Sequence, residues 1–164
     1  MKSVKHLLLA AVAAMCATAA SAAVGDMSVG ASFNYASKCN QAGLGLHYQL
    51  EVLPNVRVAP EFVYFFKNDR FSTSNVNINA QYVIHTYAGF NIYPYVGFTY
   101  QHWDYSYPDG LLDNKVKSDH CGANVGCGAE YTIADHFTFF TEWRYQIVSD
   151  HNQSVTTAGL RYNF

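Results

Sequence analysis

Seven charged residues of the sequence could form ion pairs or carry out acid–base chemistry. They are Glu51, Arg57, Glu61, Glu130, Glu142, Arg144 and Arg161. Paired carboxylates can act as a general acid and a general base, but these four carboxylates are spread over separate segments and no substrate cleft is indicated. Because a buried charge is costly without a partner, we predict that the seven residues form a structural polar network inside the protein. A proton path, a narrow channel and a gated plug are the alternatives.

Two groups of Ser, His and Asp residues could supply a nucleophile, because a His can activate a Ser hydroxyl. One group is His102 with Asp104 and Ser106, and the other is Asp150 and His151 with Ser149 or Ser154. Neither group lies in a Gly-x-Ser-x-Gly motif. We therefore interpret both groups as polar loop residues and predict that the protein is not an enzyme.

Metal and disulfide chemistry are not indicated by the sequence. The Asp residues of segment 104–119 do not have EF-hand spacing, and we interpret His47 and His85 as lumen or turn residues. Cys121 and Cys127 would lie about 20 Å apart on an extended strand, beyond the roughly 7 Å that a disulfide allows between Cα atoms. We predict no metal, no cofactor, and small apolar roles for these two cysteines and Cys39.

The elements that must position these residues alternate apolar and polar side chains with period two, which indicates β-strands. Eight such segments occur, at residues 27–35, 42–52, 56–67, 75–85, 92–101, 121–131, 137–146 and 156–164. Their connections predict tight turns at one end of the molecule and longer loops at the other, at 67–74, 104–120 and 148–154. This asymmetry is typical of outer membrane barrels.

The composition decides which face of these strands points outward. Charged residues make up only 13% of the chain and aromatic residues 16%, whereas an average protein has about 25% charged residues. The strand charges and most glycines share one face, which suits a narrow lumen, and the other face is apolar, which suits lipid. We expect Tyr35, Tyr64, Tyr100, Trp103, Tyr131, Tyr145 and Tyr162 to form the aromatic belts at the membrane surfaces. A soluble barrel with an apolar interior is the alternative.

The first 22 residues have the pattern of a secretory signal peptide. A basic start is followed by the apolar stretch 7–20 and by small residues before Ala23 and Val24. We predict cleavage after residue 22 or 23. The barrel domain then comprises residues 23–164.

The chain resembles a known family at several segments. Residues 159–164 end in the terminal Phe and alternating apolar pattern of the outer membrane β-signal, and the stretches 76–82, 93–97 and 142–150 are similar to small OmpX-type and opacity-type barrels, the "porin family" proteins of Bacteroidetes. The resemblance implies that Leu160, Tyr162 and Phe164 are read by the barrel-assembly machinery. It brings no catalytic motif.

Together these observations predict an all-β protein, an eight-stranded antiparallel up-and-down transmembrane β-barrel in the outer membrane of a Gram-negative bacterium. We expect a monomer with a structural or surface-binding role, in contact with outer membrane lipids and lipopolysaccharide. A surface partner would be reached through the long loops, and nucleic acid is excluded as a partner by the net charge of −2. A narrow channel for small or hydrophobic solutes is the alternative function, followed by a lipid-modifying enzyme.

Overall fold

The computed structural model describes residues 25–68, 71–105, 116–149 and 152–164. Within these segments the strands are β1 (Met27–Ala36), β2 (Gln41–Leu53), β3 (Val56–Asn68), β4 (Phe71–Tyr82), β5 (Ile84–His85), β6 (Phe90–Tyr105), β7 (Val116–Ala134), β8 (Phe137–Val148) and β9 (Gln153–Asn163). No helix in these segments has the length and apolar character needed to cross a membrane. The predicted signal peptide, residues 1–22, lies outside the described residues.

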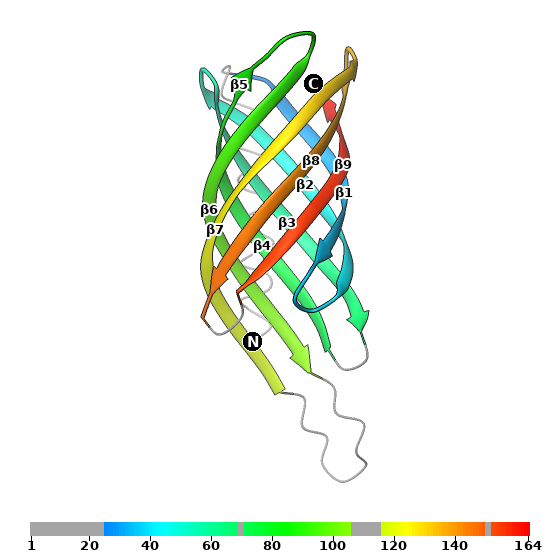
Figure 1. The fold of residues 1–164 in the computed structure, drawn as a ribbon, viewed down its shortest axis with the longest axis vertical. Helices are drawn as coiled ribbons and strands as arrows, with labels where there is room; N and C mark the ends of the chain where they lie inside the picture. The colour runs from blue at the N-terminus through cyan, green and yellow to red at the C-terminus, as the bar shows by residue number, and fades with distance from the viewer. Residues whose placement is uncertain (1–24, 69–70, 106–115, 150–151) are drawn as a thin grey trace.

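The sheet closes on itself, because β1 pairs antiparallel with both β2 and β9. Neighbouring strands are also neighbours in sequence, except that β4 pairs directly with β6 and the two-residue β5 pairs with one end of β6. Eight long strands therefore form the tilted up-and-down ring seen in Figure 1. This confirms the predicted eight-stranded antiparallel β-barrel.

The two ends of the barrel differ in their connections (Figure 1). The end drawn at the top, here called the turn end, holds the connections 54–55, 86–89 and 135–136 and the C-terminus. A tight turn is possible after Pro54 because Asn55 adopts a left-handed conformation with a φ of 66°. The opposite end, here called the loop end, is extended by the long hairpin of β6 and β7.

Several strand boundaries differ from those predicted. The predicted strand 75–85 is interrupted at Val83, whose N–H donates to the carbonyl oxygen of Asn55 at 2.7 Å instead of continuing the ladder. At the loop end, much of the predicted loops 67–74, 104–120 and 148–154 is strand. Their polar side chains resemble those of loops, but the backbone pairing continues there, as between His102 and Asp119. What remains of these loops includes 69–70, 106–115 and 150–151, which lie outside the described residues.

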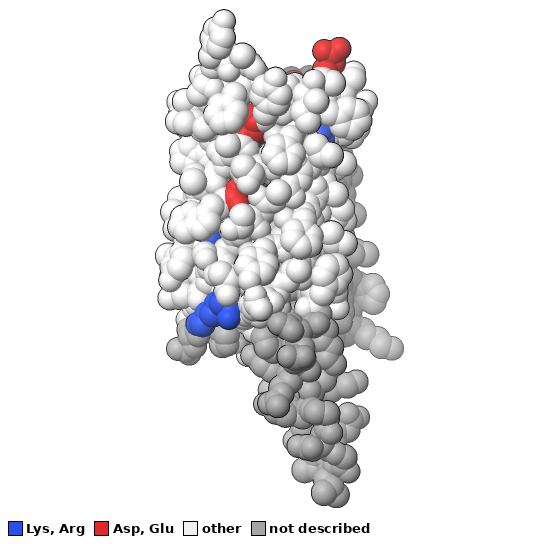
Figure 2. Space-filling view, turned by 45° about the vertical axis from the view of Figure 1, so that its right-hand side comes forward, with Lys and Arg blue, Asp and Glu red and all other residues white. Residues whose placement is uncertain are grey.

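Large apolar side chains cover the outer face of the barrel on every long strand. Figure 2 shows one side of this surface, on which charged residues are few. Most of the aromatic residues predicted for the membrane belts are exposed there, for example Tyr64 at 44% and Tyr131 at 49%, and Tyr100 is half-buried. Trp103 is an exception and corrects the prediction: it is 2% exposed, and its indole N–H donates to Gln101 inside the barrel. Trp103 occupies one of the alternate positions of β6 whose side chains point into the lumen. Tyr93, Tyr95 and Gln101, at other such positions, are also buried.

Candidate functional site

The middle of the lumen is crossed by an ion pair between Arg144 on β8 and Glu61 on β3. Nη2 of Arg144 donates to Oε1 of Glu61 at 2.8 Å, and Nη1 donates to Oε2. Both side chains are only 1% exposed. Such a two-pronged Arg–carboxylate contact is among the strongest polar interactions available to a protein. It connects strands on opposite sides of the ring.

Further polar side chains complete this central network, which we define as Glu61, Arg144, His47, Asn34 and Asn77. Asn77 donates to Glu61 at 3.0 Å, and Arg144 donates to Asn34 at 3.3 Å. Nε2 of His47 lies 3.3 Å from Glu61 and 2.6 Å from the hydroxyl oxygen of Ser32. All members are 5% exposed or less. The serine–histidine contact is thus sealed inside the barrel, away from any lipid substrate on the outer face.

An amide layer lies next to the central network, and Gln146 connects its members. Nε2 of Gln146 is 3.3 Å from Asn124 and 3.2 Å from Thr99. Its Oε1 accepts from Gln153 at 2.8 Å and from Gln101 at 3.1 Å. Further towards the loop end, an apolar cluster of Ala36, Val63, Phe65 and Val155 fills part of the lumen. Side chains therefore occupy this part of the lumen.

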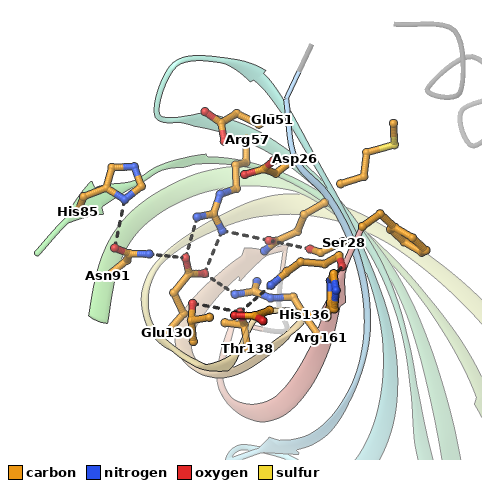
Figure 3. A pocket seen from close by; sticks show the side chains of 16 residues that line it. Asp26, Ser28, Glu51, Arg57, His85, Asn91, Glu130, His136, Thr138 and Arg161 are labelled. Atoms are coloured by element: carbon orange, nitrogen blue, oxygen red, sulfur yellow. Dashed lines mark hydrogen bonds and ion pairs between the residues drawn. The ribbon is translucent and has the colours of Figure 1, made fainter. Parts of the chain in front are cut away.

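A second charged group, the turn-end cluster, consists of Arg57, Glu130, Arg161 and Asn91 (Figure 3). Arg57 donates twice to Glu130, at 2.7 and 2.9 Å, and Asn91 donates at 3.0 Å. Nη2 of Arg161 also donates to Glu130. The Arg161 guanidinium lies 4.4 Å from the centroid of the Phe140 ring, a cation–π contact. One carboxylate is thus shared between two guanidinium groups.

The turn-end cluster borders a cavity of about 320 Å³ at the turn end of the barrel. Asp26, Glu51 and Asp135 lie around the cavity together with His85 and His136. Glu51 accepts the N–H of Asn55 at 3.2 Å and so caps the neighbouring turn. Glu51 is therefore placed near Arg57 but at the mouth, apart from the ion pairs of the lumen.

Glu142 has a different environment from the other predicted network carboxylates. It accepts the hydroxyl of Tyr93 at 2.9 Å and a long hydrogen bond of 3.5 Å from Gln81. The ring of Tyr93 fits here because Gly128 faces it, and Gly126 faces Tyr95 in the same way: a Cβ at Gly126 would lie 2.7 Å from the Tyr95 ring. The small residues predicted for the lumen thus make space for tyrosines.

The candidate nucleophile groups are only partly within the described residues. Nδ1 of His102 contacts the Asp119 carboxylate on the outer surface, beyond the part of β7 that pairs with β8. This hydrogen bond holds the pKa of the Asp119 carboxyl below its usual range. The side chain of Asp104 and residues 106, 150 and 151 lie outside the described part, whereas Ser154 contacts Ser37 through their hydroxyl oxygens at 2.7 Å.

The remaining candidates lie on the barrel surface or at the mouth of the turn-end cavity. His85 is exposed and contacts Asn91 at 3.2 Å. Cys39, Cys121 and Cys127 are free thiols, of which Cys121 and Cys127 are exposed on the outer face. No three His, Cys, Asp or Glu side chains in the described segments come together as a metal site. The proposed β-signal residues face outward, with Leu160 51% and Phe164 72% exposed.

Sequence reasoning missed much of the neutral part of the lumen. Asn77, Asn124 and Gln146 carry most of the contacts around the central ion pair, and Tyr93 and Phe140 are completely buried. The alternating pattern of the sequence does place these residues on the face that points into the lumen. The pattern does not show which of several inward amides meet, because this depends on the tilt of the strands.

Comparison with known proteins supports the architecture. The sequence matches the family model "Outer membrane protein beta-barrel domain" over residues 7–164. No curated protein sequence matches the chain significantly.

Several solved structures share the fold at low sequence identity. The N-terminal β-barrel domain of OprF from Pseudomonas aeruginosa is 16% identical, with a TM-score of 0.68, and the match covers 85% of this chain and 98% of that one. Neisserial surface protein A is 14% identical, with a TM-score of 0.67 and coverages of 85% and 96%. Ail, the attachment invasion locus protein of Yersinia pestis, is 16% identical, with a TM-score of 0.64 and coverages of 85% and 99%. The resemblance to proteins of Bacteroidetes stays a prediction.

Proposed function

Because the chain belongs to the family of outer membrane protein β-barrel domains, we propose that it is an integral outer membrane protein with a structural or surface-binding role. Its lumen is filled with side chains and it has no catalytic activity. In barrels of this class short turns face the periplasm and long loops face the exterior. The turn end is accordingly assigned to the periplasm and the loop end to the cell surface.

The burial of the central network is the observation that carries this proposal. Arg144 and Glu61 join opposite walls of the barrel and are each 1% exposed, so that water does not reach the pair. Gln101, Gln146 and Thr99 beside them are 0% exposed. An eight-stranded barrel is just wide enough for its own side chains to fill it. This packing favours a closed lumen over a conduit.

Conductance in planar lipid bilayers tests the closed lumen. We expect the wild-type protein, shown to be folded by its changed gel mobility on heating, to insert without stepwise conductance. A double variant, Glu61→Ala with Arg144→Ala, removes both long side chains of the central pair and shows whether a conducting barrel would be detected. Stepwise currents from the wild type would instead favour the alternative, a narrow channel for small or hydrophobic solutes.

The C-terminal strand supports a proposal about assembly. Leu160 and Tyr162 present their side chains on the outer face of the last strand, where a partner in the membrane can contact them, and the exposed Phe164 follows directly after the strand. We infer that the barrel-assembly machinery of a Gram-negative cell reads this strand after export. Outer membrane lipids and lipopolysaccharide then surround the barrel.

The lengths of β6 and β7 favour a surface-binding role. These strands have 16 and 19 residues, against 10 to 13 in the other long strands. About 9 to 11 residues suffice to span a membrane, so this hairpin extends beyond the lipid at the cell surface (Figure 1). A lipid-modifying activity is tested by the mass profile of lipid A from cells lacking the protein, which we expect to be unchanged.

A further inference from the structure

The cavity at the turn end has the size of a small-molecule site. Its volume of about 320 Å³ lies at the lower end of the roughly 300–1,000 Å³ of ligand pockets. It is open to the periplasm under the orientation assigned above and needs no passage through the lumen. Charged residues of both signs line it, with Arg57 and Arg161 on its inner wall and Asp26, Glu51 and Asp135 at its rim. Figure 3 shows how several of them lie.

The inner wall of the cavity carries positive charge. Arg57 and Arg161 share the carboxylate of Glu130, and the next carboxylate near Arg57 is that of Glu51 on the rim, its neighbour across the strand pair. The Arg57 side chain retains 14% exposure and reaches the cavity. Arg161 is 2% exposed, and its Nη1 makes no hydrogen bond within the described residues. This wall is complementary to a carboxylate.

The rim of the cavity carries the opposite charge. Asp26, Glu51 and Asp135 contribute three carboxylates, and among the described residues that line the cavity the only Lys or Arg residues are Arg57 and Arg161 of the inner wall. Asp26 and Asp135 are exposed. A simple anion would therefore be repelled at the rim, whereas a simple cation would gain nothing from the inner wall.

We propose that this cavity binds a small zwitterion, specifically a short peptide with free ends. Its carboxylate lies against Arg57, whose side chain reaches the cavity, with the buried charge of Arg161 behind it, and its ammonium group lies among the rim carboxylates. This proposal goes beyond the structural role of the barrel and does not depend on whether the lumen conducts.

Three probes that differ by one charge each test the proposal. Triglycine has both charges, N-acetyl-triglycine lacks the ammonium group, and triglycinamide lacks the carboxylate. Each peptide is titrated into the ¹⁵N-labelled protein, which is extracted from outer membranes into detergent micelles. The backbone amide NMR signals of Asn91, Thr132 and His136 are followed. We expect saturable shifts with triglycine and at least about tenfold weaker binding of both blocked peptides, since each loses one charge-assisted contact.

Matched variants separate the two halves of the site. Asp135→Asn should weaken the binding of triglycine but not that of N-acetyl-triglycine, which the rim charge repels. Arg57→Met should weaken the binding of triglycine but not that of triglycinamide, which the guanidinium charge repels. Asp119→Asn, which removes the same charge at the loop end, should change nothing and serves as the control. Equal affinity for triglycine and either blocked peptide would overturn the proposal, as would the absence of any shift with triglycine.

Discussion

The central network and the turn-end cluster use the same chemistry in two different settings. In the central network one guanidinium meets one carboxylate, and amide side chains seal the pair from water. In the turn-end cluster two guanidinium groups share Glu130 beside an open cavity. The first setting is shielded from solvent, although Nε of Arg144 has no hydrogen-bond partner within the described residues, and in the second the Arg57 side chain reaches the cavity. The comparison suggests that the first maintains the barrel and the second remains available for binding.

The largest expected effect comes from breaking the central pair on one side only. Arg144→Met leaves Glu61 charged and buried without its partner, which should lower the free energy of unfolding by about 3–5 kcal/mol. The double variant Arg144→Met with Glu61→Leu should recover most of this loss, because no unpaired charge remains. Urea unfolding in micelles, followed by gel mobility without heating, measures both. If Arg144→Met were as stable as the wild type, a structural role for the pair would be refuted.

The corresponding change at the turn end, Arg57→Met, should lower the free energy of unfolding less than Arg144→Met does. Arg57→Met leaves Glu130 with Arg161 and Asn91, so we expect a loss of about 1–2 kcal/mol. Because the cluster borders the cavity, this loss should shrink in about 1 M salt, where the screening length falls to about 3 Å. The loss caused by Arg144→Met should not depend on salt. Equal salt dependence of the two variants would remove the distinction between the regions.

Two neighbouring tyrosines sharpen the comparison further. The hydroxyl of Tyr93 donates to Glu142, whereas the buried hydroxyl of Tyr95 makes no hydrogen bond within the described chain. Tyr93→Phe should therefore destabilise the barrel by about 1 kcal/mol. Tyr95→Phe should be neutral or slightly stabilising, because it removes an unsatisfied polar group. The midpoints of urea unfolding of the two variants provide the measurement, and the reverse order would contradict the assigned contacts.

The smallest effect is expected outside the lumen, at the pair of Asp119 and His102. The pKa of the Asp119 carboxyl is lowered, mainly because it accepts a hydrogen bond from His102. The contribution to stability is therefore present above the ordinary pKa of an Asp, about 4, and is lost as the pH falls through the lowered value. Since the Asp119 side chain is 56% exposed, it amounts to a few tenths of a kcal/mol.

Asp119→Asn checks this sign. The wild type should be slightly more stable than the variant at pH 7, and the difference should shrink steadily as the pH falls below about 4, the ordinary Asp pKa. A difference that grows on acidification would show that the pair acts in the opposite direction.

Alternation along the chain was sufficient to predict the fold, because a period of two assigns each side chain to one face of a closed sheet. It placed Glu61 and Arg144 inside the barrel, but not in contact with each other, since partners on opposite walls depend on strand stagger. The prediction for Trp103 was wrong because tryptophan is typical of membrane belts, whereas position 103 is one of the alternate positions of β6 that point into the lumen. The loop-end boundaries were misplaced because strands that extend into water carry the polar side chains of loops.

The pairing of β1 with β9 has a consequence for how the barrel is made. A hydrogen bond across this seam, from Thr157 to Asn34, joins residues separated by 123 positions in the sequence. The ring therefore cannot close until almost the whole chain has emerged, and contacts so distant in sequence form slowly. Until then β1 presents an open strand edge, which is a template for aggregation. A chain that lost its last strand would retain most of its lumen residues and yet have no barrel in which to bury them.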